Sequence, residues 1–450
     1  MSRLFGTDGV RGVANVEITP ELAFQLGYAG AVVLARHATG KPSIIVGTDT
    51  RISKDMLQAA LVSGITAAGA DAHLAGVVPT PCVAYLTRKY GMHAGVVISA
   101  SHNSFEYNGI KFFSAQGYKL PDDIEDEIEQ VVRAGFDQIT RPAGTEIGTV
   151  YDRSEAAHDY AEHLKRRLSV DLTGLKIAVD CAHGASYAIA PALLSDLGAE
   201  VVAVGIEPDG VNINAGCGST HLELLQNTVR THRCDLGLAF DGDADRLLVV
   251  ASNGDIIDGD IIMAIMASDM MAKGTLKHNT LVVTQMSNLG LDIWAKQAGV
   301  NVIKTKVGDR YVLEAMLEGG YSLGGEQSGH FIVLEHTTTG DGLLSALHLL
   351  NVLVGRHTTI DAARTMVKIL PQILKNAKVR NGAQQTVLCD EKIMSAVQNA
   401  ESTLAGRGRV LVRASGTEPL IRVMLEGEDI IQIRKLADDL ISLIAESYGV

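Results

Sequence analysis

Three aspartates stand at alternate positions in the segment DGDADR, at Asp241, Asp243 and Asp245, directly after the apolar run LGLAF. The run predicts a buried strand, and a tight turn behind it would gather the three side chains. Gathered carboxylates repel one another unless a cation neutralises them, and their oxygens suit Mg²⁺. A calcium EF-hand is excluded because its sixth residue, here Arg246, must be glycine. We therefore expect a magnesium site in preference to a solvated acidic loop.

A second polar cluster begins at Ser101, directly after the apolar run AGVVISA, and extends through His102 and Asn103 to Lys111. Open α/β sheets place their active sites beyond the carboxyl ends of buried strands. A serine hydroxyl there can accept a phosphoryl group if a base removes its proton, and His102 and Lys111 are ionisable and close in sequence. Taken alone, the same cluster also fits a polar turn without a catalytic function.

Two glycine-rich segments offer further binding groups. GGEQSGH (324–330) puts a carboxylate, a hydroxyl and an imidazole at Glu326, Ser328 and His330, a mixture that suits sugar hydroxyls in a crevice. Near the start of the chain, GTDGVRG would bring Arg11 and backbone amides to a phosphate. A structural glycine turn is the alternative for GGEQSGH.

A phosphate cradle is indicated by RASGTEP, which begins at Arg413 and is followed by Arg422. Guanidinium groups, hydroxyls and backbone N–H groups near a glycine are what a phosphate requires. The candidate ligands are Arg413, Ser415, Gly416, Thr417 and Arg422. A charged surface loop is the alternative, and the segment 306–310 indicates only a hydrogen-bonded turn. The chain has no GxxxxGK[ST] segment, which disfavours a P-loop nucleotide enzyme.

The elements that must position these groups alternate between short β-rich runs and Ala/Leu-rich helical stretches, as in SIIVGTD followed by SKDMLQAALVSGITAAGA. This alternation predicts βαβ units. It returns near residues 175–204 and 281–305, and after Pro371 it changes to strands mixed with amphipathic helices. We expect an α/β fold of three consecutive α/β domains with mixed sheets and a smaller C-terminal α+β domain.

The expected domain boundaries follow the changes in this pattern, since 450 residues are too many for a single core. The four domains are residues 1–155 with the serine loop, 156–255 with the metal-binding loop, 256–370 with the sugar-binding loop, and 371–450 with the phosphate-binding segment.

The bulk composition excludes several classes of protein. A net charge of −13 argues against a general nucleic-acid binder. Five scattered cysteines without metal-ligand spacing indicate a reducing compartment and no structural zinc. The sequence has no basic leader with an apolar core and no uncharged apolar run of about 18 residues. We expect a cytoplasmic protein without nucleic-acid or membrane partners, and a homodimer is compatible with this composition.

In this order, the segments GTDGVRG, SASHNSFEYNGIK, DGDADR, GGEQSGH and RASGTEPLIRV resemble the α-D-phosphohexomutase superfamily over essentially the whole chain. RLFGTDGVRG, SFEYNGIKFF and GGEQSGH are more similar to phosphoglucosamine mutases than to phosphomannomutases or phosphoglucomutases. The resemblance implies three α/β domains and a smaller α+β domain around a central cleft, to which each domain contributes one loop.

The resemblance also implies a role for each motif residue. Ser101 matches the phosphoserine, and an oxygen of Ser101 or its phosphate would join Asp241, Asp243 and Asp245 in holding one Mg²⁺ per chain. Glu326 and Ser328 would hold the sugar hydroxyls. The phosphate that is not being transferred would be bound by Arg413, Ser415, Gly416, Thr417 and Arg422. Proton transfer and charge stabilisation would be left to His102, Lys111, His330 and Arg11.

The implied activity is that of an isomerase that interconverts glucosamine 6-phosphate and glucosamine 1-phosphate for UDP-N-acetylglucosamine synthesis. It would pass through a phosphoserine and a 1,6-bisphosphate, with a hexosamine or hexose 1,6-bisphosphate as activator. Phosphomannomutase or phosphoglucomutase activity is the nearest alternative. The DxD pattern also resembles haloacid-dehalogenase-type phosphatases, in which Asp241 would be the nucleophile, and a non-catalytic sugar-phosphate sensor is a third hypothesis.

Overall fold

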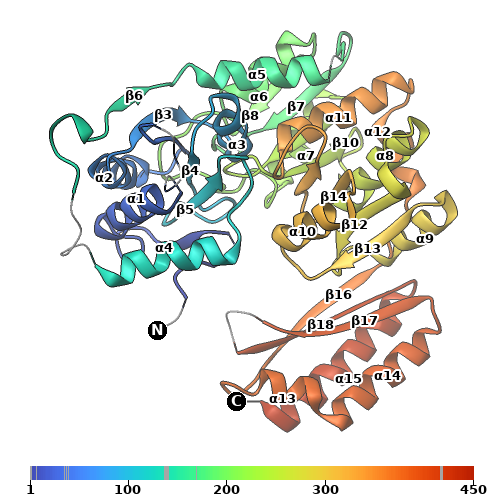
Figure 1. Ribbon diagram of the computed structural model, residues 1–450. Coiled ribbons are helices and arrows are strands. Elements are labelled where there is room, and N and C mark those ends of the chain that lie inside the picture. The colour runs from blue at the N-terminus through green and yellow to red at the C-terminus, as the bar shows by residue number, and fades with distance from the viewer. Residues whose placement is uncertain are drawn as a thin grey trace. The chain divides into compact units, whose positions relative to one another are not determined.

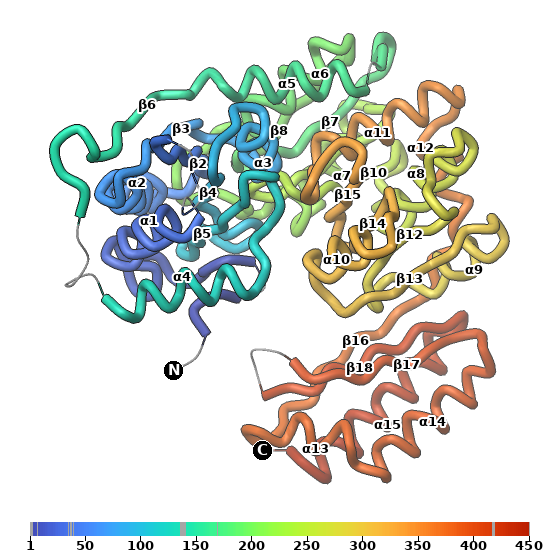
Figure 2. The backbone as a smooth tube through the Cα atoms, in the orientation of Figure 1, coloured from blue at the N-terminus to red at the C-terminus, as the bar shows by residue number. Residues whose placement is uncertain are grey.

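The computed structural model describes residues 3–6, 8–34, 36, 38, 40–135, 141–168, 170–415 and 419–449. The chain divides by its internal contacts into two compact units. The larger unit is Met1–Met286 with Gly299–Met366, and the smaller unit is Ser287–Ala298 with Val367–Val450. Among the described residues the larger unit contains three sheets and the smaller unit one. Figure 1 draws their strands as arrows, and Figure 2 follows the path of the backbone in the same orientation.

The first sheet has six strands in the order β1-β5-β4-β2-β3-β6, in which β1 and β5 run antiparallel to their neighbours and the others pair in parallel. Its strands are β1 (Val10–Val13), β2 (Ser43–Thr48), β3 (Asp71–Val77), β4 (Ala94–Ile98), β5 (Tyr107–Ser114) and β6 (Val150–Asp152). The helices of this region are α1 (Pro20–Leu34), α2 (Lys54–Ala67), α3 (Thr80–Lys89) and α4 (Asp122–Ala134), with a 3₁₀ turn at Gly144–Glu146.

Both faces of this sheet are covered. Ile44 and Val46 of β2 belong to one buried cluster with residues of α1, α2 and α4. Because strand side chains alternate between faces, Ile45 points to the opposite side, where α3 packs against β2 and β4. A strand buried on both faces reads as a continuous apolar run, which is why SIIV and AGVVI lack polar alternation.

The second sheet has the order β11-β10-β9-β7-β8, with β7, β8 and β9 parallel and β10 and β11 antiparallel. Its strands are β7 (Lys176–Asp180), β8 (Glu200–Val204), β9 (Leu236–Phe240), β10 (Leu247–Ala251) and β11 (Ile256–Ile257), and its helices are α5 (Ala156–Arg167), α6 (Ile189–Asp196) and α7 (Glu223–His232). Leu225 and Val229 of α7 pack on Ala178, Ala239 and Val250. The six residues between β9 and β10 are the DGDADR segment.

The third sheet has the order β13-β12-β14-β15, in which only the β14–β15 pairing is antiparallel. Its strands are β12 (Thr280–Thr284), β13 (Asn301–Thr305), β14 (Leu323–Gly325) and β15 (Phe331–Val333), and its helices are α8 (Gly259–Ala272), α10 (Asp309–Gly319), α11 (Gly342–Gly355) and α12 (Ile360–Ala363), with 3₁₀ turns at Lys277–Asn279 and Arg364–Met366. Asp258 and Asp341 cap α8 and α11 by accepting backbone N–H groups. The turn between β14 and β15 carries residues 326–330.

The smaller unit contains an antiparallel sheet of order β16-β18-β17. Its strands are β16 (Gln372–Lys378), β17 (Gly408–Ala414) and β18 (Leu420–Gly427), and its helices are α9 (Leu289–Ala298), α13 (Gln384–Cys389), α14 (Glu391–Leu404) and α15 (Ile430–Tyr448). Helices α14 and α15 lie side by side against the sheet (Figure 1). The amphipathic spacing in α15 explains this packing, because Ile433, Ala437, Leu440 and Ile444 all face the core.

The predicted fold class is confirmed. Three mixed sheets carry helices in the α/β regions, and the last sheet is antiparallel, as expected for a C-terminal α+β domain. Among the described helices, none is both long and apolar enough to span a bilayer.

Candidate active site

Ser101 lies just beyond the carboxyl end of β4 and is almost completely buried. Its hydroxyl donates a hydrogen bond to Asp241 Oδ2 at 2.6 Å, and its Oγ lies 3.3 Å from His102 Nδ1. The backbone of Ser101 has a φ of 52°, a left-handed conformation that a non-glycine residue rarely adopts. The serine is therefore held in an unusual conformation with its hydroxyl directed at the first aspartate of the DGDADR segment.

The three aspartates of that segment form a buried cluster that fits a divalent cation. One carboxylate oxygen from each of Asp241, Asp243 and Asp245 lies within 4.8 Å of the others. Among the described residues, Asp243 Oδ1 and Asp245 Oδ1 are buried without a hydrogen-bond partner. Burial, followed by the charges of Asp245 and Asp243, raises the pKa of Asp241 well above its ordinary value. A Mg²⁺ ion would coordinate these unpaired carboxylate oxygens and would offset the repulsion among the three aspartates.

Lys111 of β5 supplies a buried positive charge beside this cluster. Its Nζ lies 2.8 Å from Asp243 Oδ2 and 2.8 Å from Asp8 Oδ2. Burial by itself disfavours the charged amine, but Asp243 and Asp8 outweigh it and raise the pKa of Lys111 above its ordinary value. Thr80 also donates to Asp243 Oδ2, at 2.7 Å. Lys111 is thus a permanent cation at this site.

His330 connects the metal-binding loop to a second acidic residue. Its Nδ1 lies 3.4 Å from Asp245 Oδ2 and its Nε2 lies 3.4 Å from Asp309 Oδ2. Burial favours the neutral ring, but the two carboxylates outweigh burial and raise the pKa of His330 to about 8. For His102, by contrast, burial and then the charges of Arg246 and Arg11 lower the pKa to about 4. The carboxylates around His330 thus favour its protonated ring, whereas burial and two arginines favour the neutral ring of His102.

These groups surround a cavity of about 230 Å³. The residues that line it are Asp8, Arg11, Ser101, His102, Lys119, Asp245, Arg246, Val307, Gly308, Asp309, Glu326 and His330. They come from all three α/β regions of the larger unit. A cavity rich in both cations and carboxylates suits a polar anion with several hydroxyl groups.

The GGEQSGH turn contributes to the same cavity. Glu326 Oε1 accepts the N–H of Gly308 at 3.1 Å, and Glu326 Oε2 accepts the Ser328 hydroxyl at 3.2 Å. The N–H of Leu247, at the start of β10, donates to the carbonyl of Gly329, which ties this turn to the end of the metal-binding loop. Glu326 and Ser328 thus lie together, with oxygens available for sugar hydroxyls.

The candidate phosphate cradle belongs to the smaller unit. Arg413 of β17 and Arg422 of β18 stand directly opposite each other in the antiparallel register. Burial and then the charge of Arg422 lower the pKa of Arg413, and the hydroxyl of Ser415 is buried without a hydrogen-bond partner among the described residues. Like charges directly opposite in a sheet are destabilising, and an anion between them would remove that cost. Gly416 and Thr417 lie outside the described residues.

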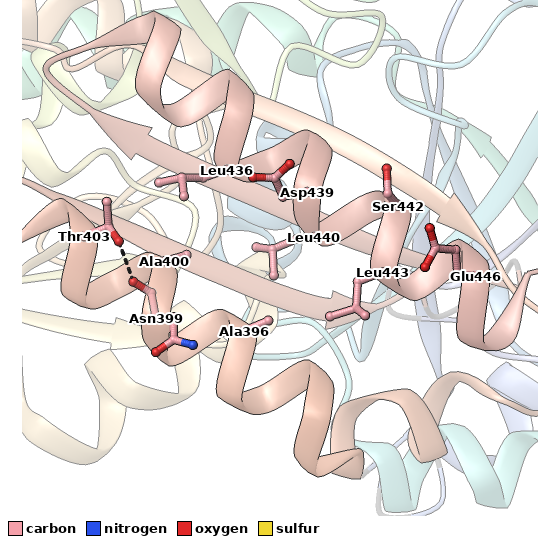
Figure 3. Close-up of a pocket in the computed structure, with 10 residues that line it drawn as sticks. All are labelled: Ala396, Asn399, Ala400, Thr403, Leu436, Asp439, Leu440, Ser442, Leu443 and Glu446. Carbon is pink, nitrogen blue, oxygen red and sulfur yellow. Dashed lines mark hydrogen bonds between the residues drawn. The ribbon is translucent and has the colours of Figure 1, made fainter.

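A second hollow, which belongs to the smaller unit, lies between α14 and α15 (Figure 3). It has a volume of about 460 Å³, and its ten lining residues include Leu436, Leu440 and Leu443 with Asp439 and Glu446. None of these ten residues is basic. A phosphosugar would meet carboxylates and no cation there, so the smaller cavity at Ser101 is the better candidate for the active site.

Comparisons with known proteins identify a family for this chain. Models of the phosphoglucomutase/phosphomannomutase family match residues 2–138 (α/β/α domain I), 158–254 (domain II), 258–370 (domain III) and 374–443 (C-terminal domain). The phosphoglucosamine mutase of Ruminiclostridium cellulolyticum is 55% identical over 444 residues, 99% of each chain. That of Acetivibrio thermocellus is 53% identical over 449 residues, 100% of each chain.

The chain belongs to the phosphoglucosamine mutase family, within the α-D-phosphohexomutases. Members of this family are isomerases. Among solved structures, a phosphoglucomutase/phosphomannomutase family protein from Burkholderia thailandensis has the same fold, with a TM-score of 0.83 at 23% identity over 99% of this chain and 98% of that one. In a phosphohexomutase, the cluster of three aspartates is consistent with a metal site.

Four charged residues of this phosphohexomutase site were not singled out from the sequence, namely Asp8, Lys119, Arg246 and Asp309. Asp8 lies in GTDGVRG and Arg246 in DGDADR, so they could have been found by considering every charged residue of each motif. Asp309 lies in the segment 306–310, which the sequence indicated only as a turn, yet three residues of that segment line the cavity. Lys119 is in no motif, and only the tertiary structure reveals its position.

Lys119→Met is expected to destabilise this family member by roughly 3 kcal/mol, because a buried cation would be lost from between two carboxylates. Lys119 Nζ lies 2.5 Å from Asp8 Oδ1 and is also paired with Asp309, and both carboxylates raise its pKa against the effect of burial. Adding Asp309→Asn should recover part of the loss in urea unfolding. The control is Lys273→Met, whose side chain is 55% exposed. Equal losses in the two single variants would contradict the argument.

Proposed function

We propose that this enzyme interconverts glucosamine 6-phosphate and glucosamine 1-phosphate through a phosphoserine at Ser101 and a 1,6-bisphosphate. The observation that carries the proposal is the Ser101 hydroxyl, 2.6 Å from Asp241 Oδ2 and beside the buried Asp243 and Asp245. The hexosamine substrate is taken from the relatives in R. cellulolyticum and A. thermocellus, which are named phosphoglucosamine mutases. The product would supply UDP-N-acetylglucosamine synthesis.

The proposed reaction has two phosphoryl transfers. In the first, the bond between phosphorus and Ser101 Oγ breaks, a bond between phosphorus and O1 of glucosamine 6-phosphate forms, and the O1 proton leaves. After the bisphosphate reorients, the bond between phosphorus and O6 breaks, that phosphorus bonds to Ser101 Oγ, and the O6 atom gains a proton. His102 and His330, whose side chains both line the cavity, are the groups we propose for these proton transfers.

Charge neutralisation is the main requirement of phosphoryl transfer. Lys111 and Arg11 carry positive charge close to Ser101, and Lys111 is paired with Asp243 at 2.8 Å. One Mg²⁺, held by the three aspartates and an oxygen of Ser101 or its phosphate, would act as a Lewis acid toward the transferred phosphoryl group. A hexosamine or hexose 1,6-bisphosphate would supply the first phosphate to the serine.

The remaining substrate groups are assigned by their chemistry. Glu326 and Ser328 share a hydrogen bond of 3.2 Å in the turn that lines the cavity, and we propose that they bind sugar hydroxyls. Arg413 and Arg422 face each other across two strands, and a phosphate dianion would relieve their repulsion. With Ser415, Gly416 and Thr417, they would therefore bind the phosphate that is not being transferred.

Arg422→Ala is expected to weaken phosphosugar binding by about 1.5 to 3 kcal/mol, the scale of a hydrogen bond to a charged group. Calorimetric titration with glucosamine 6-phosphate measures this effect. Arg434→Ala, an exposed change of equal charge in α15, is the control. Unchanged affinity in Arg422→Ala would remove this residue from the site.

The test of the proposed activity is a coupled assay for glucosamine 1-phosphate formed from glucosamine 6-phosphate, with Mg²⁺ and glucose 1,6-bisphosphate. Glucose 6-phosphate and mannose 6-phosphate are run in parallel. The proposal predicts the highest kcat/KM for glucosamine 6-phosphate. A preference for either neutral sugar would favour phosphoglucomutase or phosphomannomutase activity, and no turnover of any of the three would favour a sensor.

A phosphatase with Asp241 as its nucleophile is the main alternative of a different reaction type. Both oxygens of Asp241 are already engaged, because Oδ2 accepts from Ser101 and Oδ1 accepts from the N–H of Arg246 at 3.2 Å. This arrangement favours a fixed ligand over a free nucleophile. Release of inorganic phosphate at the rate of sugar-phosphate consumption would reverse this preference.

A further inference from the structure

Arg51 is a completely buried arginine in the loop after β2, and it does not line the active-site cavity. Its Nε pairs with the equally buried Asp49 at 2.9 Å. The two terminal nitrogens donate to four backbone carbonyls of the serine loop, those of Ser101, Asn103, Ser104 and Tyr107. A buried guanidinium whose two terminal nitrogens both donate to one loop fixes the path of that loop.

Asn214, from the second α/β region, holds the same loop from the other side. Its Nδ2 donates to the carbonyl of Ser101 at 2.9 Å and to that of Asn103 at 3.0 Å. The backbone at Gly242 also approaches closely, since a Cβ there would lie 2.6 Å from the Ser101 carbonyl oxygen. Two side chains from different parts of the chain therefore converge on one carbonyl oxygen.

The loop that carries Arg51 is itself anchored on both sides of that residue. The Thr50 hydroxyl donates to the carbonyl of His183 at 2.6 Å, and the N–H of Ile52 donates to the carbonyl of Gly210 at 2.8 Å. Both acceptors belong to the second α/β region, which also supplies the metal-binding aspartates. Arg51 thus links the serine loop to the same α/β region that positions the aspartates.

The N–H of Ser101 is held by a hydrogen bond that leads back to Asp49. It donates to Ser99 Oγ at 3.0 Å, and the Ser99 hydroxyl donates to Asp49 Oδ2 at 2.6 Å. Both backbone polar groups of Ser101 are thus held by side chains, and Asp49 orients Arg51 as well as Ser99. This network accounts for how Ser101 keeps a φ of 52°, a conformation that is unfavourable for a non-glycine residue.

We propose that Arg51 and Asn214 are positioning residues for phosphoryl transfer: by fixing the carbonyl of Ser101, they direct its Oγ toward Asp241 and the substrate. The inference rests on the proposed mutase function. Neither side chain lines the cavity, so neither is expected to contribute to sugar binding. Their contribution should therefore appear in the transfer rate and not in substrate affinity.

The test compares the wild type with Arg51→Lys and Asn214→Ala in the full chain. Arg51→Lys keeps the charge beside Asp49 but cannot span four carbonyls, and we expect kcat to fall roughly 100-fold, as for a reacting atom displaced by about 1 Å. Asn214→Ala removes the second donor and should lower kcat roughly tenfold. Calorimetry with glucosamine 6-phosphate should give an unchanged Kd and one site per chain, and rapid-quench phosphorylation of Ser101 by glucose 1,6-bisphosphate should slow in parallel with kcat.

Asp269→Ala is the control for a purely structural loss. Asp269 is buried in α8, is paired with Lys273 and Arg356, and is not among the residues that line the cavity. Its loss should therefore lower the unfolding temperature without changing kcat per binding-competent chain. If Arg51→Lys and Asn214→Ala retain wild-type kcat, or lose binding stoichiometry in proportion to kcat, the inference is wrong. If Arg51→Lys is insoluble, Asn214→Ala decides the question. A wild type without mutase turnover would overturn the proposed function instead.

Discussion

Ser101→Ala is expected to lower kcat of the mutase reaction on the order of 10⁴-fold or more, the scale on which removal of a nucleophilic hydroxyl acts. Alanine leaves the aspartates and Lys111 in place, but it removes the oxygen that lies 2.6 Å from Asp241 Oδ2. The coupled assay measures the loss. Mass spectrometry after incubation with glucose 1,6-bisphosphate should find one phosphate on the peptide that contains Ser101 in the wild type and none in the variant.

Ser104→Ala is the matched control for that experiment. Ser104 belongs to the same loop, three residues further on, and its side chain is exposed. Because surface substitutions rarely change stability by more than about 0.5 kcal/mol, its kcat should stay within about twofold of the wild-type value. Wild-type turnover in Ser101→Ala would exclude the phosphoserine. Phosphate release that survives in Ser101→Ala would point to a phosphatase with Asp241 as its nucleophile.

Asp241→Asn is expected to separate stability from activity. Burial and the neighbouring Asp245 and Asp243 raise the pKa of Asp241 well above its ordinary value. A carboxyl whose pKa is higher in the folded than in the unfolded state makes the protein lose stability as pH rises above about 4. The neutral amide removes that loss. In EDTA at neutral pH, the variant should therefore unfold at a higher temperature than the wild type.

Addition of Mg²⁺ should reverse this order. A ligand that binds the folded state raises its stability, and the wild type with three carboxylates should gain more from the ion than the variant with two. We expect kcat of Asp241→Asn to fall roughly 10²- to 10³-fold, as when one stabilising group is removed from a transition state. Differential scanning calorimetry with EDTA and with Mg²⁺ measures the reversal, independently of activity.

Asp123→Asn controls for the change in net charge, because Asp123 is exposed in the first turn of α4. It should respond to Mg²⁺ as the wild type does. A variant of Asp241 that is less stable than the wild type in EDTA would show that the carboxylate cluster is not under electrostatic strain. An unchanged Mg²⁺ response would remove Asp241 from the metal site.

The fold could be predicted because it rests on local patterns. Continuous apolar runs such as SIIV indicate strands buried on both faces, and the spacing of Ile433, Ala437 and Leu440 indicates a helix with one buried face. Such local patterns do not indicate which strands of the α/β regions run antiparallel. The order in which β5 and β1 join the first sheet depends on contacts between distant segments, which periodicity does not encode.

By itself, the sequence determined those groups of the candidate site that stand together in short motifs. The aspartates of DGDADR, the Ser101 cluster and the GGEQSGH turn are each contiguous, so a single tight turn after a strand suffices to gather their groups, and such turns depend on local residue types. The tertiary structure alone decided which groups hold these segments together. Asn214 donates to Ser101, which is 113 positions away in the sequence, and Lys119 pairs with Asp309, which is 190 positions away. These contacts form because the order of the strands brings loops from separate segments together. A buried arginine such as Arg51 carries no local signal, since its partners are backbone carbonyls that every residue possesses.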